Sequence, residues 1–462
     1  MNPAVDLSTT KHVHVIGIGG AGMAAIAEVL HGMGHRVSGS DLQASGAFDR
    51  LIDLGIEAVI GHDASNVGSP DVVARSTAIP DSNVEVVEVH ERGEVVLRRA
   101  ELLGSITSMR KTAAVAGTHG KTTTSSMLAV IARQAGVDPS FIIGGEVTDL
   151  GTGAAWGEGD WFVVEADESD GTFLELGHTI GLVTNVEPDH LEYYGDEETM
   201  RAAFADFVAA SKVAVVCADD EGAQRLPVSS NIVTYGASED ATYRMMDIER
   251  SSEATTFDLY RSSVLLGRLR VPMPGIHNAR NATGATAAAM EMGLPFRAAQ
   301  AAMANFGGVG RRFDPRGTAA GVTFIDDYAH LPTEVMAALD AAVDTRHERV
   351  VAVFQPHRYS RTEALWEEFE GVFDAADVLI VTDIYSAGEK PREGINGELI
   401  VEAIQRRAGH PTIVYHADRA SLPTRVMTEL RPGDLCLTLG AGDLVSLPDE
   451  VQALLEPTQE RQ

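Results

Sequence analysis

The sequence predicts an α/β protein of three domains, and three observations lead to that prediction. The chain has 462 residues, more than a single hydrophobic core normally organises. Glycine-rich turns follow apolar runs at two places, 17–22 and 117–120. Apolar runs alternate with amphipathic segments along the chain, as in parallel sheets covered by helices. We expect a Rossmann-like N-terminal domain over 1–108, a central α/β domain with a phosphate-loop pattern and a mixed sheet over 109–313, and a C-terminal Rossmann-like α/β domain over 314–462.

The first domain begins with the apolar run HVHVIGIG, which predicts a strand over 12–19. A helix over 21–34 and a second strand over 35–41 follow, and then short strand and helix units to about residue 106. A strand, a glycine turn, a helix and a second strand in this order are typical of a nucleotide-binding fold.

The second domain starts with a strand over 112–117 and a helix from Lys121. The runs WFVVEAD, TIGLVTN and KVAVVCA predict further buried strands, and TTFDLY and VLLGRLRVP predict an antiparallel section. An alanine-rich helix from Asn278 onward is expected to end this domain near Gly310.

The third domain starts at GVTFIDD, over 321–327. Four further runs, VVAVFQP, VLIVTDI, TIVYHA and DLCLTLGAG, alternate with amphipathic segments. This alternation predicts a second Rossmann-like sheet.

Composition and charge narrow the possible classes of function. A formal net charge of −31 argues against nucleic-acid binding, which requires a basic surface. No apolar run reaches the roughly 18 residues of a membrane helix, and the N-terminal segment lacks the pattern of a secretory signal. Cys217 and Cys436 lie far apart in apolar runs and are expected to be core thiols of a reduced compartment. We therefore expect a cytoplasmic protein with no membrane insertion.

The first glycine loop, GIGGAGM, has the spacing G-x-G-x-x-G at Gly17, Gly19 and Gly22. Such glycines permit a tight turn and a close approach of the backbone to an anionic phosphate at a helix N-terminus. Asp41, at the end of the next strand, lies where an acid usually reaches a ribose hydroxyl. The pattern favours a phosphate-containing ligand over a simple tight turn, and it leaves open which nucleotide binds.

The second loop, GTHGKTTT, is more specific. Its backbone N–H groups would surround phosphates, Lys121 would neutralise the β- and γ-oxygens, and Thr122 would reach Mg²⁺. Val115 stands where the usual P-loop motif has its first glycine, and Gly117 follows two residues later. The setting of strand, loop and helix favours a phosphate site over a chance Gly-Lys-Thr.

Acidic residues and a histidine follow two neighbouring strands of the second domain. The first group is Glu165, Asp167, Glu168 and Asp170, and the second is Asn185, Asp189 and His190. Because the carboxyl ends of parallel strands share one edge of a sheet, both groups should lie beside the loop 117–123. Mg²⁺ prefers such oxygen ligands, so we expect Glu165 and His190 to be metal ligands rather than solvated caps.

Polar residues near the end of the second domain have two possible roles each. In GIHNARN, His277, Asn278 and Asn281 could hydrogen-bond an adenine edge, but the residues alone favour Asn278 as a helix cap. In GRRFD, Arg311 and Arg312 could clamp a phosphate or could be a solvated linker pair.

Two polar strings follow apolar strands of the third domain, DDYAHLPTE at 326–334 and QPHRYSRT at 355–362. Their position at strand ends favours a binding rim over surface decoration. The residues concerned are Asp326, Asp327, Tyr328, His330, His357, Arg358 and Arg361.

Taken together in this order and spacing, these motifs resemble those of the Mur ligase family, and DIYSAGEKP adds a further match. The resemblance extends from Gly17 to about Gly442. It implies a domain for a UDP-sugar, a central ATPase domain and a C-terminal domain that receives an amino acid.

The resemblance also implies roles for individual residues. Those at ATP would be Gly117, Thr118, His119, Gly120, Lys121, Thr122, Thr123, His277, Asn278, Asn281, Arg312 and Asp327. Those at the UDP-sugar would be Gly17, Gly19, Gly20, Gly22, Met23, Asp41, His119, Tyr328 and His330. The amino-acid side would have His357, Arg358 and Arg361, and the metal ligands would be Thr122, Glu165 and His190. The catalytic residues would be Lys121, His190, Glu165, Arg312 and His119, the last as a contact to the muramate carboxylate.

The reaction that the resemblance implies is the ATP-dependent ligation of L-alanine to the lactyl carboxylate of UDP-N-acetylmuramate. It would pass through an acyl phosphate, release ADP and phosphate, and belong to the synthesis of peptidoglycan precursors. The implied cofactors are ATP and Mg²⁺ at two sites, with Mn²⁺ as a substitute. The partners would be small-molecule substrates, and the chain would be a monomer or a homodimer.

Two positions depart from patterns of the family. Members that add later residues carry a carbamylated lysine where this chain has Phe204, so no carbamate is expected. Leu331 stands where DDYxHHPTE has its second histidine, which leaves the substrate preference more open than the catalysis.

Three alternatives remain at this point. The nearest is a peptide-recycling ligase of the same family that adds a tripeptide. An NAD-dependent oxidoreductase would use GIGGAGM but would leave GTHGKTTT unexplained. A P-loop nucleotide switch would give no role to the two polar strings of the third domain.

Overall fold

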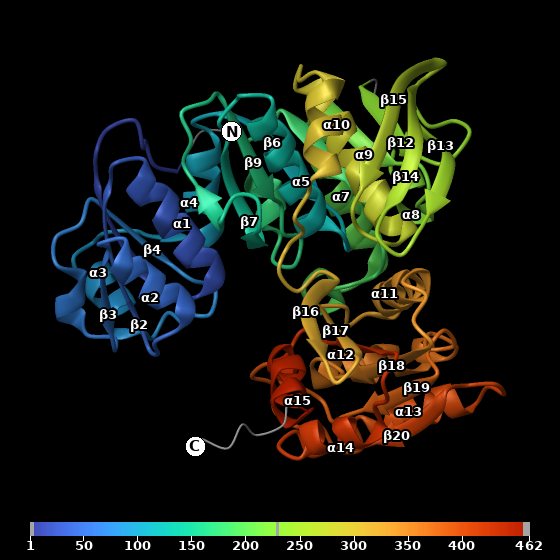
Figure 1. The fold of residues 1–462 in the computed structure, drawn as a ribbon. Helices are drawn as coiled ribbons and strands as arrows, with labels where there is room; N and C mark the ends of the chain where they lie inside the picture. The colour runs from blue at the N-terminus through green and yellow to red at the C-terminus, as the bar shows by residue number, and fades with distance from the viewer. Residues whose placement is uncertain (1–3, 228–230, 456–462) are drawn as a thin grey trace, which may run out of the picture. The chain divides into compact units, whose positions relative to one another are not determined.

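The computed structural model describes residues 4–227 and 231–455, in which the strands form three sheets (Figure 1). The chain divides into two compact units. The first unit spans 1–248, 257–270 and 280–307, and the second spans 249–256, 271–279 and 308–462. The predicted α/β class with three sheets is therefore confirmed, while the domain boundaries at 108/109 and 313/314 stay predictions.

The first sheet has five parallel strands in the order β3-β2-β1-β4-β5. The chain moves outward from β1 to one side and then to the other, which is the doubly wound pattern that the sequence predicted. The strands are β1 (His12–Ile16), β2 (Arg36–Asp41), β3 (Glu57–Ile60), β4 (Val72–Arg75) and β5 (Val96–Arg98). The helices are α1 (Ala21–Gly32), α2 (Gly46–Asp53), η1 (Ala64–Val67), α3 (Val84–Glu91) and α4 (Arg99–Thr107).

The second sheet has ten strands in the order β15-β14-β13-β12-β11-β10-β6-β9-β7-β8. It is mixed, because β7 pairs antiparallel with β8 and parallel with β9. The strands are β6 (Lys111–Ala116), β7 (Ser140–Val147), β8 (Thr152–Ala155), β9 (Trp161–Glu165), β10 (Ile180–Val183), β11 (Val213–Cys217), β12 (Ile232–Gly236), β13 (Tyr243–Arg250), β14 (Thr255–Arg261) and β15 (Val264–Val271). The helices are α5 (Lys121–Gln134), η2 (Thr172–Glu175), α6 (Leu191–Tyr194), α7 (Glu197–Ala210), α8 (Glu221–Gln224), α9 (Ile276–Glu291) and α10 (Phe296–Ala304).

The prediction of one alanine-rich helix from Asn278 to near Gly310 was wrong in its extent. The helix α9 starts at Ile276 and ends at Glu291, and a separate helix α10 follows. Gly293 between them has a φ of +87°, and Pro295 precedes the first residue of α10. A glycine in the left-handed region and a proline both interrupt an α-helix, and the predicted helix divides there.

The third sheet has the order β16-β17-β21-β18-β19-β20 and is parallel except for the antiparallel edge strand β16. The strands are β16 (Asp314–Ala319), β17 (Val322–Asp327), β18 (Arg349–Phe354), β19 (Val378–Val381), β20 (Thr412–Tyr415) and β21 (Asp434–Leu439). The helices are α11 (Pro332–Asp344), α12 (Tyr359–Leu365), η3 (Trp366–Phe369), α13 (Glu398–Gln405), α14 (Leu422–Glu429), η4 (Asp443–Ser446) and α15 (Leu447–Leu455).

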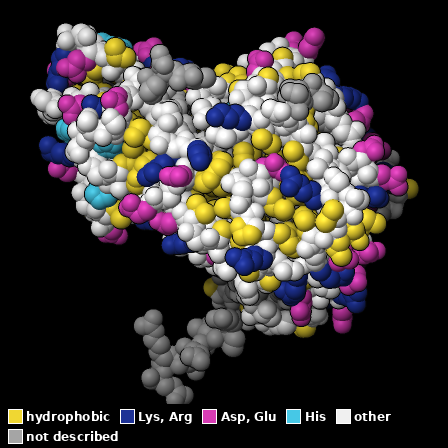
Figure 2. All heavy atoms as spheres, turned by 90° about the horizontal axis from the view of Figure 1, so that it is seen from above, with side chains coloured by type: hydrophobic (Ala, Val, Ile, Leu, Met, Phe, Trp, Pro, Cys, Tyr) yellow, Lys and Arg dark blue, Asp and Glu magenta, His cyan; other side chains and the backbone are white. Residues whose placement is uncertain are grey.

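Burial follows the apolar patterns. Every residue of α5 from Thr122 to Ala132 is buried, so the helix behind the second glycine loop has a fixed position in the core. Cys217 and Cys436 are free, buried thiols. Among the described residues, no helix is both long and apolar enough to cross a membrane. On the face that Figure 2 shows, acidic and basic side chains are interspersed.

Candidate active site

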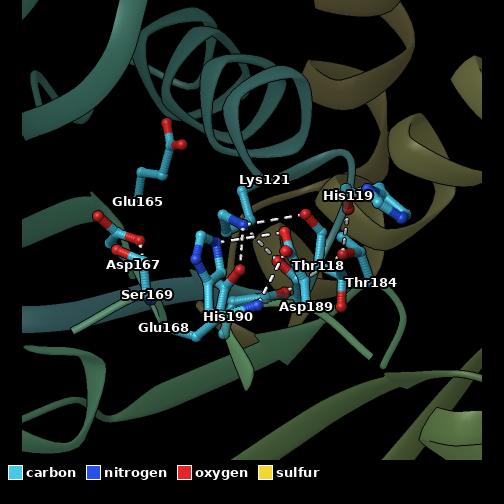
Figure 3. Close-up of polar contacts among 12 residues, drawn as sticks. Thr118, His119, Lys121, Glu165, Asp167, Glu168, Ser169, Thr184, Asp189 and His190 are labelled. Carbon is cyan, nitrogen blue, oxygen red and sulfur yellow. Dashed lines mark hydrogen bonds and ion pairs between the residues drawn. The ribbon is translucent and has the colours of Figure 1, made fainter. Parts of the chain in front are cut away.

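The second glycine loop leaves the end of β6 and enters α5. Its strand lies between β10 and β9, and both neighbours run parallel to it. The segments that follow β9 and β10 therefore meet the loop at one edge of the sheet, which confirms the predicted arrangement of these strands. Figure 3 shows the side chains from the three segments close together.

The loop is held in place by the segment after β10. The N–H of His119 donates to Oδ1 of Asn185 at 2.7 Å, and Nδ2 of Asn185 donates to the carbonyl of His119 at 3.0 Å. The N–H of Glu187 donates to the hydroxyl of Thr118 at 2.9 Å. These contacts leave the loop little freedom, so its backbone is already shaped when a ligand arrives.

Lys121, the first residue of α5, has its ammonium group inside a ring of oxygen atoms. Its Nζ donates to the carbonyls of Gly117 at 2.6 Å and Thr118 at 3.1 Å, and to Oε1 of Glu168 at 2.8 Å. Burial alone would lower the pKa of Lys121, but Glu168, Asp167 and Glu165 outweigh burial and raise that pKa. The lysine is therefore charged at neutral pH and can neutralise a phosphate.

Thr122 and Glu165 lie together beside the loop. The hydroxyl of Thr122 donates to Oε1 of Glu165 at 3.0 Å, and the N–H of Gly144 donates to Oε2 of Glu165 at 2.7 Å. These bonds orient the carboxylate next to the hydroxyl. A hydroxyl and a carboxylate side by side suit one Mg²⁺ that takes its other ligands from water and phosphate.

His190 lies beside Lys121, near Glu168 and Asp189 (Figure 3). It has a φ of +54°, and its Nε2 lies 3.3 Å from Oδ2 of Asp189. Of the three predicted metal ligands, Thr122 is hydrogen-bonded to Glu165, and His190 is paired with Asp189. The described residues contain no cluster of three or more His, Cys, Asp or Glu side chains arranged to hold a metal.

The imidazole of His119 points away from Lys121 and Glu165 (Figure 3). Its Nε2 lies 3.2 Å from Oε2 of Glu187. This orientation gives no support to a direct contact between His119 and the muramate carboxylate, which stays an untested prediction.

The first glycine loop turns tightly between β1 and α1. The N–H groups of Gly17 and Ile18 both donate to the carbonyl of Ser40, at 2.8 and 3.0 Å. The N–H of Gly19 donates to Oδ2 of Asp41 at 2.9 Å. Asp41 therefore contacts the loop itself, and a bound anion would compete with it for that N–H group.

A buried polar network lies behind this loop. The carboxylate of Glu85 accepts from the hydroxyl of Ser40 at 2.7 Å and from Nδ2 of Asn66 at 2.9 Å, and lies 3.1 Å from Nε2 of His14. Burial alone would raise the pKa of Glu85, but bonds from His14, Asn66 and Ser40 lower it to about 2. The charged network fixes Ser40, whose carbonyl holds the loop.

The three residues predicted to contact adenosine, at the start of α9, have different surroundings. Asn278 is buried, and its Nδ2 donates to the carbonyl of Pro274 at 2.8 Å, so its side chain does not cap the helix as an acceptor. The amide of Asn281 lies over the glycine loop, because a Cβ on Gly120 would come within 2.7 Å of its Oδ1. His277 lies with Gly275, near the helix start.

Two arginines and Tyr328 lie at the edge of the third sheet. The guanidinium carbons of Arg311 and Arg312 are both 4.9 Å from the centre of the Tyr328 ring. Arg311 also donates to the carbonyl of Gly440 at 2.7 Å. Burial, opposed by Arg312, raises the pKa of Asp327 to about 6, and its two oxygens accept from backbone N–H groups. The predicted polar string after β17 therefore forms one cluster.

The second predicted string joins this cluster through histidine rings. The rings of His330 and His357 are 5.4 Å apart, and His357 stacks on Tyr385 at 5.8 Å. Nη1 of Arg361 lies 3.0 Å from Nδ1 of His357. Burial first, and then His330, Arg361 and Arg358, lower the pKa of His357 to about 3. A neutral, half-buried imidazole beside arginines suits recognition of a polar, anionic group.

Three family models match consecutive parts of the chain, and together they cover most of its length. Residues 12–111 match the model described as Mur ligase family, catalytic domain. Residues 115–289 match the Mur ligase middle domain, and residues 311–442 match the Mur ligase, glutamate ligase domain.

The chain belongs to the Mur ligase family.

Two curated relatives of this Mur ligase are UDP-N-acetylmuramate–L-alanine ligases. The protein of Geobacter sp. (strain M21) is 45% identical over 458 residues, 97% of this chain and 99% of the relative. That of Myxococcus xanthus (strain DK1622) is 44% identical over 465 residues, 99% of this chain and 98% of the relative.

Solved structures agree in fold. UDP-N-acetylmuramate-alanine ligase MurC from Thermotoga maritima has a TM-score of 0.78 and 28% identity, covering 96% of this chain and 99% of that chain. A murein peptide ligase from Psychrobacter arcticus has a TM-score of 0.70 and 22% identity, covering 96% and 98%, and shows likeness of fold alone.

Both departures of this Mur ligase from family patterns lie in the core. Phe204 is fully buried, and its ring is 5.2 Å from that of Phe173. Leu331 is also buried, directly before α11. Phe204 belongs to the apolar cluster that includes Phe173 and Phe207.

The structure shows contacts for three residues to which the sequence assigned no role in the site. Glu168 pairs with Lys121, Asp189 pairs with His190, and Thr184 donates to the carbonyl of His119. The positions of these residues after β9 and β10 could have indicated them. Nothing in the sequence could have shown which oxygen faces which donor.

Gly120 and Gly136 provide a matched test of the loop of this Mur ligase, because both flank α5 with a φ of +78°. A Cβ on Gly136 would meet nothing within 4 Å, whereas one on Gly120 would lie 2.7 Å from the buried amide of Asn281. We expect Gly136→Ala to cost about 1 kcal/mol of stability, the strain of a left-handed residue, with no loss of activity.

Gly120→Ala should carry the same strain and in addition displace Asn281 or the loop. We expect the KM for ATP to rise about tenfold or more, since a small displacement of positioning groups has large kinetic effects. Steady-state kinetics and thermal unfolding of both variants provide the measurement. Equal KM values for the two variants would contradict the role of this close contact.

Proposed function

We propose that this chain joins L-alanine to the lactyl carboxylate of UDP-N-acetylmuramate with conversion of ATP to ADP and phosphate, a step in the synthesis of peptidoglycan precursors. One observation carries the proposal. Over 97 to 99% of its length the chain is 44 to 46% identical to enzymes of that name. The comparisons favour this activity over the tripeptide-adding alternative, and neither an oxidoreductase nor a nucleotide switch accounts for them.

The second glycine loop binds the triphosphate of ATP in this proposal. The backbone of Gly117 to Gly120 surrounds the phosphates, and Thr123 follows in the first turn of α5. Lys121 exchanges part of its contact with Glu168 for the β- and γ-phosphate oxygens. His277, Asn278 and Asn281 form the adenosine side, with Asn278 acting through its buried amide.

Thr122 and Glu165 would hold one Mg²⁺, and His190 would serve a second. A bound Mg²⁺ draws charge from the phosphate oxygens during transfer. Asp189 and the N–H of Gly144 keep the ligand side chains in position.

The first glycine loop binds the UDP-sugar and takes no part in bond making. Gly17, Gly19 and Gly20 form the turn, Gly22 and Met23 lie in the first turn of α1, and Asp41 stands at its side.

Two steps follow from this arrangement. A lactyl carboxylate oxygen attacks the γ-phosphorus, the bond to ADP breaks, and an acyl phosphate forms. Lys121 offsets the negative charge that develops on the transferred group. The alanine nitrogen, once its ammonium has lost a proton, then attacks the acyl carbon, and phosphate leaves with the electron pair of the C–O bond. Water must be excluded, because it would hydrolyse the acyl phosphate.

His357, Arg358 and Arg361 form the amino-acid side. Arginine binds a carboxylate through two parallel hydrogen bonds, which would orient the amine of alanine towards the acyl carbon. We further propose a cytoplasmic location, where these substrates are small soluble molecules, and a monomer or homodimer.

The test is ADP release with UDP-N-acetylmuramate and, separately, L-alanine, glycine, L-serine, a tripeptide or no acceptor. We expect full turnover only with both acceptors present and highest kcat/KM with L-alanine. Turnover independent of UDP-N-acetylmuramate would refute the proposal, and a preference for the tripeptide would establish the recycling activity instead.

A further inference from the structure

Arg99 lies between the two glycine loops, within the first compact unit. It is the first residue of α4, the helix that leads from the first sheet to β6 (Figure 1). Its guanidinium covers Gly22 in the first turn of α1. A Cβ on Gly22 would come within 3.3 Å of Cζ and Nε of Arg99 and within 3.5 Å of Nη2. Arg99 thus lies at the glycine loop that binds the UDP-sugar in the proposed function.

Two aspartates that follow β9 face Arg99 from the other side. Nη1 of Arg99 lies 3.6 Å from Oδ2 of Asp167 and 3.8 Å from Oδ2 of Asp170. Both distances exceed those of a hydrogen bond. The other oxygen of each aspartate accepts a backbone N–H, from Ser169 at 3.1 Å and from Thr172 at 3.0 Å. The two carboxylates are therefore held in place, and they attract Arg99 without bonding it closely.

At least one N–H group of the Arg99 guanidinium is available to donate a hydrogen bond to a ligand. Nε of Arg99 is buried and has no hydrogen-bond partner within the described part of the chain. A buried donor left without a partner costs free energy, so its presence calls for an acceptor. The planar guanidinium fork matches the oxygens of a phosphate. The net charge of the chain is −31, so an anionic ligand requires a cationic side chain such as Arg99 close to its binding site.

We propose that Arg99 binds the diphosphate of the nucleotide sugar at the start of α1, and that Asp167 and Asp170 hold the guanidinium ready for it. This inference rests on the proposed function and adds a residue to the substrate site. Arg99 links the cradle of the UDP-sugar to the segment that carries Glu165 and Glu168, and so positions the sugar relative to the ATP loop.

The test compares UDP with UMP as ligands by calorimetry, because only UDP carries a second phosphate. For the wild type we expect UDP to bind more tightly than UMP. Arg99→Gln should weaken UDP binding roughly 10- to 100-fold, the loss of charge-assisted hydrogen bonds, and should change UMP binding much less. Arg99→Lys, which keeps the charge, should recover part of the difference. The KM for UDP-N-acetylmuramate should rise in parallel, with the KM for ATP nearly unchanged.

Arg98→Gln is the matched control. Arg98 precedes Arg99, and its Nη2 donates to Glu175 at 3.0 Å, so it too joins α4 to the segment after β9, but without contact to Gly22. We expect Arg98→Gln to bind UDP and UMP as the wild type does.

Two results would overturn the inference. One is an unchanged ratio of UDP to UMP affinity in Arg99→Gln. The other is an equal effect of Arg98→Gln, because it would indicate a purely structural bridge. A wild type that binds UDP but performs no ligation would instead refute the proposed function alone. A wild type that does not bind UDP would refute both.

Discussion

Lys121→Met is expected to lower kcat/KM for ligation by about 10³-fold, the loss found when a preorganised charged donor is removed from a transition state. The ammonium group of Lys121 lies in the ring formed by Gly117, Thr118 and Glu168, and its raised pKa keeps it charged. Methionine has a similar length but no charge, so the charge on the transferred phosphate would lose its nearest protein cation. Initial rates of ADP release at saturating UDP-N-acetylmuramate and L-alanine give the measurement.

Loss of stability must be separated from loss of chemistry in this variant. Without Lys121, the buried carboxylate of Glu168 loses its ion-pair partner, and breaking a buried pair costs about 3 to 5 kcal/mol. We expect the double variant Lys121→Met/Glu168→Gln to recover thermal stability and to remain inactive. Recovery of activity in the double variant would show that the lysine acts through folding alone.

Lys111→Met is the control for a change of lysine to methionine. Lys111 is the exposed first residue of β6, at the opposite end of the strand from the loop. Its replacement should leave kcat/KM within about twofold of the wild type, since exposed substitutions away from a site have small effects.

The sequence predicted those parts of the site that depend on strand order. The loop after β6 and the acidic segments after β9 and β10 meet because the three strands are parallel neighbours, and apolar runs ending in polar residues already indicate this. Chain direction and burial are local properties of the sequence, so the positions of Lys121, Thr122 and Glu165 could be predicted.

Side-chain directions could not be predicted in this way. His119 lies in the loop as expected, yet its imidazole faces Glu187, because the rotamer depends on a residue about 70 positions further along the chain. Arg99 had no motif to mark it, since its contacts with Gly22 and Asp167 arise only from the packing of α4 between two sheets. The helix break at Gly293 and Pro295 had a local signal, which the run of alanines obscured.

Glu165→Gln is expected to lower kcat/KM by about 10²- to 10³-fold and to raise the Mg²⁺ concentration required for half-maximal activity. The glutamine has nearly the same shape, and its single carbonyl oxygen can still accept from Thr122 or from Gly144. Because the hydroxyl of Thr122 can rotate to accept a hydrogen bond, the local structure should persist while the negative charge is lost. The effect would therefore report on charge at the cation site rather than on folding.

Glu158→Gln is the matched control, since Glu158 is exposed and precedes β9 at the end opposite to Glu165. Titration of the ligation rate with MgCl₂ at saturating ATP separates the two variants. We expect the Mg²⁺ requirement of Glu158→Gln to equal that of the wild type and the requirement of Glu165→Gln to be higher. An unchanged requirement in Glu165→Gln, together with a lowered kcat, would remove Glu165 from the metal and leave it only the task of orienting Thr122.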